Sequence, residues 1–187
     1  MAKSTKTALG NALKRILERK PLSKVTITDI TDECGLTRMT FYYHFQDIYD
    51  LIEWMCIAEA EQALTGKVST THWHEGLYNI FQLVLENRHF VYNVYHSVSR
   101  EHLEKYIYRL TEDLFAEVVD EASRGYSIPQ ETKTFIADFY KYAFVGIMFN
   151  WIDTNMKEDP KEIVSKLELL IGENIREAIE RFEHNLV

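Results

Sequence analysis

Six side chains between residues 38 and 44 have the chemistry to bind a nucleic acid. Their guanidinium, hydroxyl and imidazole groups can bind phosphate oxygens or base edges, and the thioether can contact a base. Phe41 and Phe45 are four residues apart, so on a short helix both would point to the same, inner side. The pattern therefore predicts a helix that two phenylalanines anchor and whose other side faces DNA. The candidate residues are Arg38, Met39, Thr40, Tyr42, Tyr43 and His44.

The residues before this helix predict the second element that would hold it in place. Thr26 can cap a short helix, and Asp29 at its third position completes a capping box. Gly35 can take the positive φ needed just past a helix end, and Thr37 can cap the next helix. Two short helices joined by a tight turn that contains glycine form a helix-turn-helix, the element that places a recognition helix in the major groove.

The run GLTRMTFYYHFQDIYDL at residues 35–51 resembles the signature of the TetR family of transcriptional regulators. The resemblance covers about residues 5–55 and implies a dimeric DNA-binding protein with a second, effector-binding domain. It also implies that Tyr42 and His44 contact the DNA backbone. The family commonly carries a lysine at the start of the fourth helix that reaches a phosphate, and this chain has Ile48 there. Residues 42–54 are similar to TetR-type regulators of dihydroxyacetone kinase operons, some of which are activators that answer to a protein partner.

The individual contacts differ in kind. Thr40 and Tyr43, in the middle of the helix, are the expected base-edge contacts. Arg38 could bind a guanine or, at the first helical position, a phosphate. Tyr42 could instead pack against the first helix of the chain, and His44 could instead form a hydrogen bond within the domain.

Charge is distributed unevenly along the 187 residues, whose net charge is −8. Residues 1–50 carry eight Lys and Arg against six Asp and Glu, and the remainder carries 13 against 23. The asymmetry favours a nucleic-acid module attached to an acidic body. Lys6 and Thr28 are further phosphate-binding candidates, the latter near a helix N-terminus. Because the basic excess is small, binding would depend on placement within a dimer rather than on a broad basic field.

The spacing of apolar residues predicts an all-α protein with about nine helices, which cover approximately residues 4–20, 27–34, 38–45, 47–65, two segments within 73–98, and 100–123, 128–153 and 160–184, the eighth starting at a capping box of Ser127 and Gln130. We expect a DNA-binding domain at residues 1–47 and an effector-binding and dimerisation domain at residues 48–187. No apolar run reaches the roughly 20 residues that span a membrane. The N-terminus lacks a secretory core, so we expect a cytoplasmic protein.

Aromatic and histidine side chains in the middle of the chain could line an effector pocket. The simpler alternative for each of them is that it fills the core. The effector could be a small molecule, or a protein co-regulator, in which case the domain would expose an apolar patch instead of a pocket. The pocket candidates are Trp54, Tyr78, Phe81, Tyr95, His96, His102 and Tyr106.

The last two predicted helices indicate a homodimer. Residues 134–152 are apolar nearly all round, and such a helix must be covered on more than one side. A partner subunit could provide the second cover through a four-helix interface, whereas the alternative is a core helix in a monomer. The expected interface residues are Phe139, Phe144, Ile147, Met148, Trp151, Leu167, Ile171 and Ile175.

Motifs for catalysis and metal binding are missing from the sequence. There is no nucleophile elbow, P-loop, zinc-protease motif or dinucleotide fingerprint, so we expect neither an enzyme nor a cofactor. Cys34 and Cys56, and His72 and His74, lack metal-ligand spacing. The competing hypothesis is a helical protein-interaction adaptor or co-regulator with weak or no DNA binding, which Ile48 and the low basicity favour.

Overall fold

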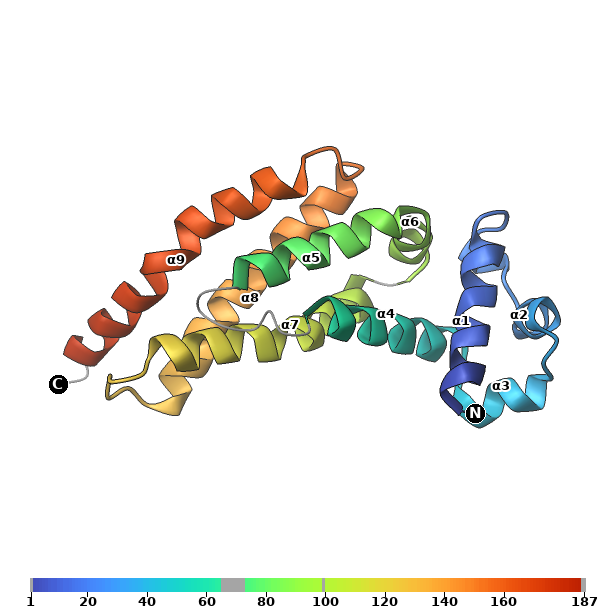
Figure 1. Ribbon diagram of the computed structural model, residues 1–187, viewed down its shortest axis with the longest axis horizontal. Coiled ribbons are helices and arrows are strands. Elements are labelled where there is room, and N and C mark those ends of the chain that lie inside the picture. The colour runs from blue at the N-terminus through green and yellow to red at the C-terminus, as the bar shows by residue number, and fades with distance from the viewer. Residues whose placement is uncertain (1, 65–72, 99, 186–187) are drawn as a thin grey trace. The chain divides into compact units, whose positions relative to one another are not determined.

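The structure is a computed structural model of the chain that describes residues 2–64, 73–98 and 100–185 (Figure 1). The regular elements within these ranges are all helical, which confirms the predicted all-α class and the nine α-helices. They are α1 (Ala2–Leu17), η1 (Leu22–Lys24), α2 (Ile27–Cys34), α3 (Arg38–His44), α4 (Ile48–Leu64), α5 (Trp73–Glu86), α6 (Arg88–Ser97), α7 (Arg100–Ala122), α8 (Gln130–Asp153) and α9 (Pro160–Asn185).

The helices pack into two compact units. The first consists of Met1–Ala60 and Glu86–Leu103, and the second of Glu61–Leu85 and Glu104–Val187. Helix α6 therefore belongs to the same unit as α1, α2 and α3, although α5 lies between them in the sequence. The domain boundary expected at residue 47 stays a prediction.

The start of α2 has the capping box that the sequence predicts. The Thr26 hydroxyl accepts a hydrogen bond from the Asp29 backbone N–H at 3.2 Å, and the Asp29 carboxylate accepts one from the Thr26 backbone N–H at 2.7 Å. Two amide groups that the helix itself cannot satisfy are thereby paired. Lys20 also donates to Asp29 at 2.6 Å, which ties the end of the α1 region to α2.

The turn and the second helix also follow the prediction. Gly35 has φ of 68°, the left-handed conformation that glycine adopts without strain. Thr37 caps α3 by accepting a hydrogen bond from the Thr40 backbone N–H. Phe41 and Phe45 are 0% and 3% exposed, so α3 is anchored on its inner side as expected.

The core of the first unit joins all its elements. Phe90 and Val94 of α6 lie in the same buried cluster as residues of α1, η1, α3 and α4. Full burial of a large apolar side chain contributes about 1.5–3 kcal/mol, so these contacts fix α6 to the helix-turn-helix. The cluster comprises Leu9, Ala12, Leu13, Ile16, Leu17, Leu22, Val25, Ile30, Phe41, Phe45, Leu51, Ile52, Met55, Phe90 and Val94.

Acid should weaken the first unit through Asp29. Hydrogen bonds from the Lys20 ammonium and from Thr26 lower the pKa of Asp29 from its usual 3.8 to about 2. A carboxyl group with a lower pKa in the folded state adds stability above its unfolded pKa, and this stability is lost as the pH falls towards the folded value. We expect thermal unfolding monitored by circular dichroism to show Asp29→Asn less stable than wild type at pH 6. The difference should shrink between pH 4 and pH 2, and a difference that stays constant would contradict the assignment.

The second unit is built around an aromatic core. The Phe81 ring of α5 lies 5.0 Å from the Trp151 ring and 5.7 Å from the Phe144 ring, both on α8. Helices α8 and α9 run antiparallel as a hairpin (Figure 1). Asp159 and Pro160 start α9 as predicted, with the Lys161 backbone N–H donating to the Asp159 carboxylate. Among the described residues, none of the helices combines the length and apolar character needed to cross a membrane.

Candidate nucleic-acid interface

The outer side of α3 carries large side chains that the chain leaves uncovered. Met39 is 82% exposed, Tyr43 is 83% exposed, and Tyr42 and Arg38 are also exposed. Exposed apolar surface that is concentrated on one short helix is typical of a binding surface rather than of a solvated face. Since Phe41 and Phe45 hold the opposite side in the core, the outer side of α3 faces solvent, as the sequence predicts.

The other two α3 candidates are less exposed. The Thr40 hydroxyl lies 2.9 Å from the Thr37 hydroxyl, so it shares its hydrogen bonds with the helix cap. The half-buried His44 ring contacts the rings of Tyr43 and Phe45, at centroid distances of 4.9 and 6.3 Å. The Tyr42 ring meets the Phe41 ring edge-on at a centroid distance of 5.8 Å. Tyr42 is nevertheless 50% exposed, so part of its side chain remains accessible to DNA.

Several cations of the first unit are used to join its helices. Arg15 and Arg19 of the α1 region both pair with Glu33 of α2, and Lys20 pairs with Asp29. Lys14 pairs with Glu59 of α4. The charge count of the first 50 residues therefore overstates the cations that remain for DNA.

Three cations of residues 4–50 have no acidic partner among the described residues, namely Lys6, Lys24 and Arg38. The Lys6 ammonium lies 5.1 Å from the centre of the Phe45 ring and 5.6 Å from that of Trp54. Such cation–π contacts contribute about 0.5–1 kcal/mol at exposed sites, so they orient Lys6 without neutralising its charge. Thr28, the second residue of α2, is exposed near the N-terminus of that helix.

Comparison with known families decides the classification. Residues 11–55 match the family of bacterial regulatory proteins of the tetR type. Residues 71–173, more than half of the chain, match a family described as transcriptional regulator C-terminal region. The chain belongs to the TetR family. No curated protein matches this TetR-family sequence.

Solved structures of TetR regulators share the fold at low sequence identity. One is a dihydroxyacetone kinase operon activator, DhaS, with 19% identity and a TM-score of 0.72 over 96% of this chain and 98% of that chain. A TetR regulator from Streptococcus agalactiae 2603V has 19% identity and a TM-score of 0.62 over 91% and 94% of the two chains. NalD, the secondary repressor of the MexAB-OprM multidrug efflux pump in Pseudomonas aeruginosa, has 19% identity and a TM-score of 0.57 over 97% of each chain.

Tyr49 is an exposed residue of this TetR-family chain that the sequence analysis missed. It lies in the first turn of α4 and is 54% exposed, while Leu51 and Ile52 of the same helix are buried. The helical spacing around these buried residues could have identified Tyr49 as an outward-facing aromatic. Ile48, where the resemblance leads one to expect a lysine, is half-buried against the core.

The pocket candidates are divided between the two units. Trp54, Tyr95 and His96 belong to the first unit, and Tyr78 and Phe81 belong to the second. Trp54 packs on Phe45 at 5.9 Å, and the exposed His96 ring contacts Tyr95 at 5.4 Å. The side chains of His102 and Tyr106 lie outside the described residues. Phe81 is 0% exposed, so it fills the core of its unit.

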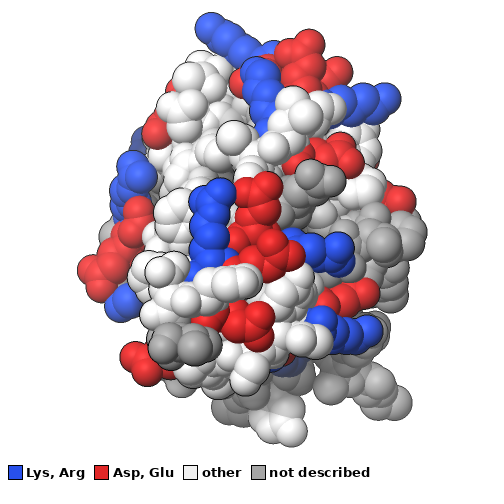
Figure 2. Space-filling model, turned by 90° about the vertical axis from the view of Figure 1, so that its left-hand side faces the viewer, with Lys and Arg blue, Asp and Glu red and all other residues white. Residues whose placement is uncertain are grey.

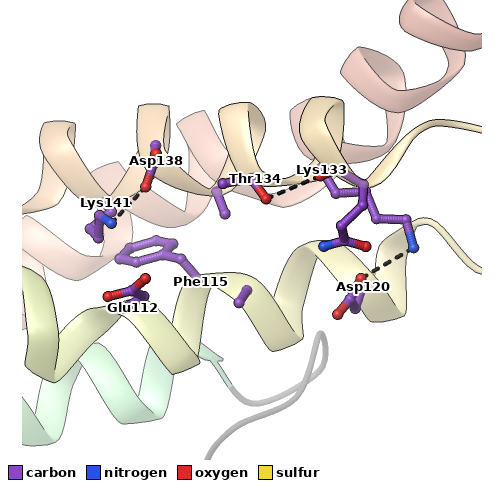
Figure 3. Close-up of a pocket in the computed structure, with 10 residues that line it drawn as sticks. Glu112, Phe115, Asp120, Lys133, Thr134, Asp138 and Lys141 are labelled. Atoms are coloured by element: carbon purple, nitrogen blue, oxygen red, sulfur yellow. Dashed lines mark hydrogen bonds and ion pairs between the residues drawn. The ribbon is translucent and has the colours of Figure 1, made fainter.

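A small groove between α7 and α8 lies in the second unit (Figure 3). Its volume is about 100 Å³, enough for only a few water molecules. Lys141 is 7% exposed and pairs with Asp138 at 2.6 Å, and Lys133 pairs with Asp120 at 3.1 Å. Burial alone would lower the pKa of Lys141, but the hydrogen bond and charge of Asp138 raise it above its usual value. None of the five pocket candidates whose side chains the structure describes lines this groove.

Most of the residues expected at a dimer interface are covered by their own chain. Phe139 is 61% exposed and Ile147 is half-buried, but the other six are at most 4% exposed because the apolar stripes of α8 and α9 face the core of their own unit. The six buried residues are Phe144, Met148, Trp151, Leu167, Ile171 and Ile175. The exposed large apolar side chains among the described residues of α8 and α9 are Phe139, which was expected, and Phe135, Tyr142, Leu169 and Leu170.

Charges of both signs are mixed on one face of the protein (Figure 2). On the face in Figure 2, Lys and Arg side chains alternate with Asp and Glu, with uncharged surface between them. This face of the TetR-family protein therefore carries no broad field of one sign.

Proposed function

We propose that this TetR-family protein is a dimeric transcriptional regulator that binds a near-palindromic operator through α3. The observation that carries the proposal is the outer side of α3, where Met39 and Tyr43 are more than 80% exposed opposite the two buried phenylalanines. A two-fold dimer would present two such helices to successive major grooves, which implies two half-sites related by symmetry. The matched families describe regulators, and we accordingly assign the protein no enzymatic activity and place it in the cytoplasm.

The α3 residues divide by chemistry. Tyr43 and Arg38 extend into solvent and are assigned to base edges, and Met39 can contact a thymine methyl group. Tyr42, His44, Thr28 and Lys6 are assigned to the phosphate backbone. Thr40 would reach a base edge only by exchanging its hydrogen bond with Thr37.

Selection from a random pool of double-stranded DNA tests this proposal directly. The purified protein should enrich a palindrome at near-physiological salt, and its affinity for the enriched duplex should fall steeply as salt rises, because bound phosphates release counterions. Failure to enrich any sequence at several salt concentrations would contradict the proposal. It would favour the second candidate, an interaction adaptor, which the small number of unpaired cations also supports.

The dimer is proposed to form over the exposed apolar surface of α8 and α9. Phe135, Phe139 and Tyr142 follow one another at i, i+4 and i+7 on α8, and Leu169 is 83% exposed on α9. A second copy of the chain would cover this surface by helix packing.

Phe139→Glu should convert the dimer into a monomer. The substitution places a charge in the centre of the proposed interface, where burying an unpaired carboxylate is unfavourable, whereas in the isolated subunit the position is exposed. Sedimentation velocity over a range of concentrations measures the change, and circular dichroism should show unchanged helix content. Lys157→Glu, at an exposed position outside both apolar stripes, is the control and should sediment as the wild type does.

We further propose that the second unit responds to a protein co-regulator rather than to a small molecule. Phe81, a candidate for a pocket wall, is instead 0% exposed and contacts Phe144 and Trp151. One similar structure is an operon activator and another a repressor, so a reporter assay should measure transcription in both directions. A metabolite that binds the purified protein and changes its DNA affinity would overturn this part of the proposal.

A further inference from the structure

Helix α6 is hydrogen-bonded to α1 as well as packed against it. The Asn93 side-chain amide donates to the Leu17 carbonyl at 3.4 Å, at the C-terminal end of α1. Phe90 and Val94 of α6 are 7% and 5% exposed within the shared core. The position of α1 in the first unit therefore depends on α6.

Lys14 of α1 connects three helices at one point. Its ammonium donates to the Glu59 carboxylate of α4 at 2.5 Å and to the Asn87 side-chain carbonyl, at the start of α6, at 2.6 Å. It also lies 5.7 Å from the centre of the Phe90 ring. A lysine ammonium has three donor hydrogens, and two of them are used by the Glu59 and Asn87 oxygens.

The two acceptors mark the places where the chain leaves and re-enters the first unit. The first unit ends at Ala60, one residue after Glu59, and resumes at Glu86, one residue before Asn87. The intervening segment, Glu61–Leu85, belongs to the second unit and contains most of α5. Lys14 thus contacts the two residues of the first unit that flank this segment, one on each side.

We propose that Lys14 is the positioning residue that couples the second unit to the DNA-binding helices. A single ammonium can satisfy Glu59 and Asn87 together only while these two residues keep one separation. A partner that changes this separation would break one of the two hydrogen bonds and so change the energy of α1 in its DNA-binding position. Coupling of this kind is reciprocal in free energy, so we expect DNA binding in turn to bias the second unit. The inference rests on the proposed DNA-binding function.

Lys20 offers a matched control. Like Lys14, it makes a short ion pair within the first unit, at 2.6 Å, and both side chains of the pair are about one-third exposed. The side-chain exposure in the Lys14–Glu59 pair is 30% for each partner. Lys20, however, contacts Asp29 of α2 and neither end of the inserted segment. Loss of Lys20 removes a comparable ion pair without touching the connection.

The test is amide hydrogen exchange in α5 of the full chain, with and without the duplex enriched from the random pool. In wild type and Lys20→Met, the duplex should change the exchange rates of peptides within residues 73–86. In Lys14→Met, that change should be lost. Asn87→Ala should reduce it while retaining the Lys14–Glu59 pair, and the Asn87 side chain makes no helix-cap hydrogen bond whose loss could unfold α6.

The outcomes separate the two proposals. If wild type binds no duplex, the proposed function fails. In one contrary outcome, wild type binds the duplex without any change of exchange in α5. In another, the change is as large in Lys14→Met and Asn87→Ala as in wild type. In either case the DNA-binding function stands and the role of Lys14 is overturned.

Discussion

Replacing Tyr43 with alanine should lower the affinity for the enriched duplex and relax its sequence preference. Tyr43 is 83% exposed on α3, so its removal leaves the fold intact and deletes only what the ring and hydroxyl contribute to the complex. Loss of a base-edge contact costs about 1–3 kcal/mol, which corresponds to a roughly 5- to 150-fold weaker complex. Fluorescence anisotropy with the selected palindrome and with duplexes altered at single base pairs measures both effects.

Tyr92→Ala provides the comparison. Tyr92 is also an exposed tyrosine of the first unit, at 47%, but it lies on α6 rather than on α3. Its removal should leave affinity and sequence preference unchanged. Equal DNA binding by wild type and Tyr43→Ala would show that Tyr43 does not belong to the recognition surface.

The other large effect is expected at Phe81, whose truncation to alanine should lower the free energy of unfolding by about 3–5 kcal/mol. The ring is 0% exposed and packs edge-on against Phe144 and Trp151, so its loss leaves a cavity that these rings cannot fill. Urea unfolding followed by circular dichroism gives the value.

The result would also decide whether Phe81 lines a pocket. A residue at the wall of an open pocket has few neighbours on one side, so its truncation would cost little. Tyr78→Phe on the same helix is the control, since it removes only a hydroxyl that accepts a hydrogen bond from Gln82. A similar small loss in both variants would restore Phe81 as a pocket residue.

The sequence predicts the helix-turn-helix well because its signals are local. The Thr26 and Asp29 capping box, the positive φ of Gly35 and the two buried phenylalanines all depend on residues within four positions of one another. The exposed side of α3 follows from the same spacing. Such signals operate within one or two turns of a helix and do not depend on the rest of the fold.

The contacts that the sequence does not predict are those between distant elements. Apolar periodicity shows that one side of α8 or α9 is covered, but not whether the cover is the same chain or another. For this reason Leu167 and Ile171 were expected at the dimer interface and lie in the core of their own unit instead. Likewise, nothing near Lys14 in the sequence indicates that its partner is Asn87, 73 residues away.

The placement of α6 has a consequence for the order in which the protein folds during synthesis. The core around α1 includes Phe90 and Val94, so a nascent chain that ends before residue 86 lacks part of the packing that completes this core. Closing a contact over such a distance along the chain is slow compared with forming local helices. The recognition helix would then reach its final stability only after α6 has been synthesised, and at that point about half of the 187 residues are still to be made.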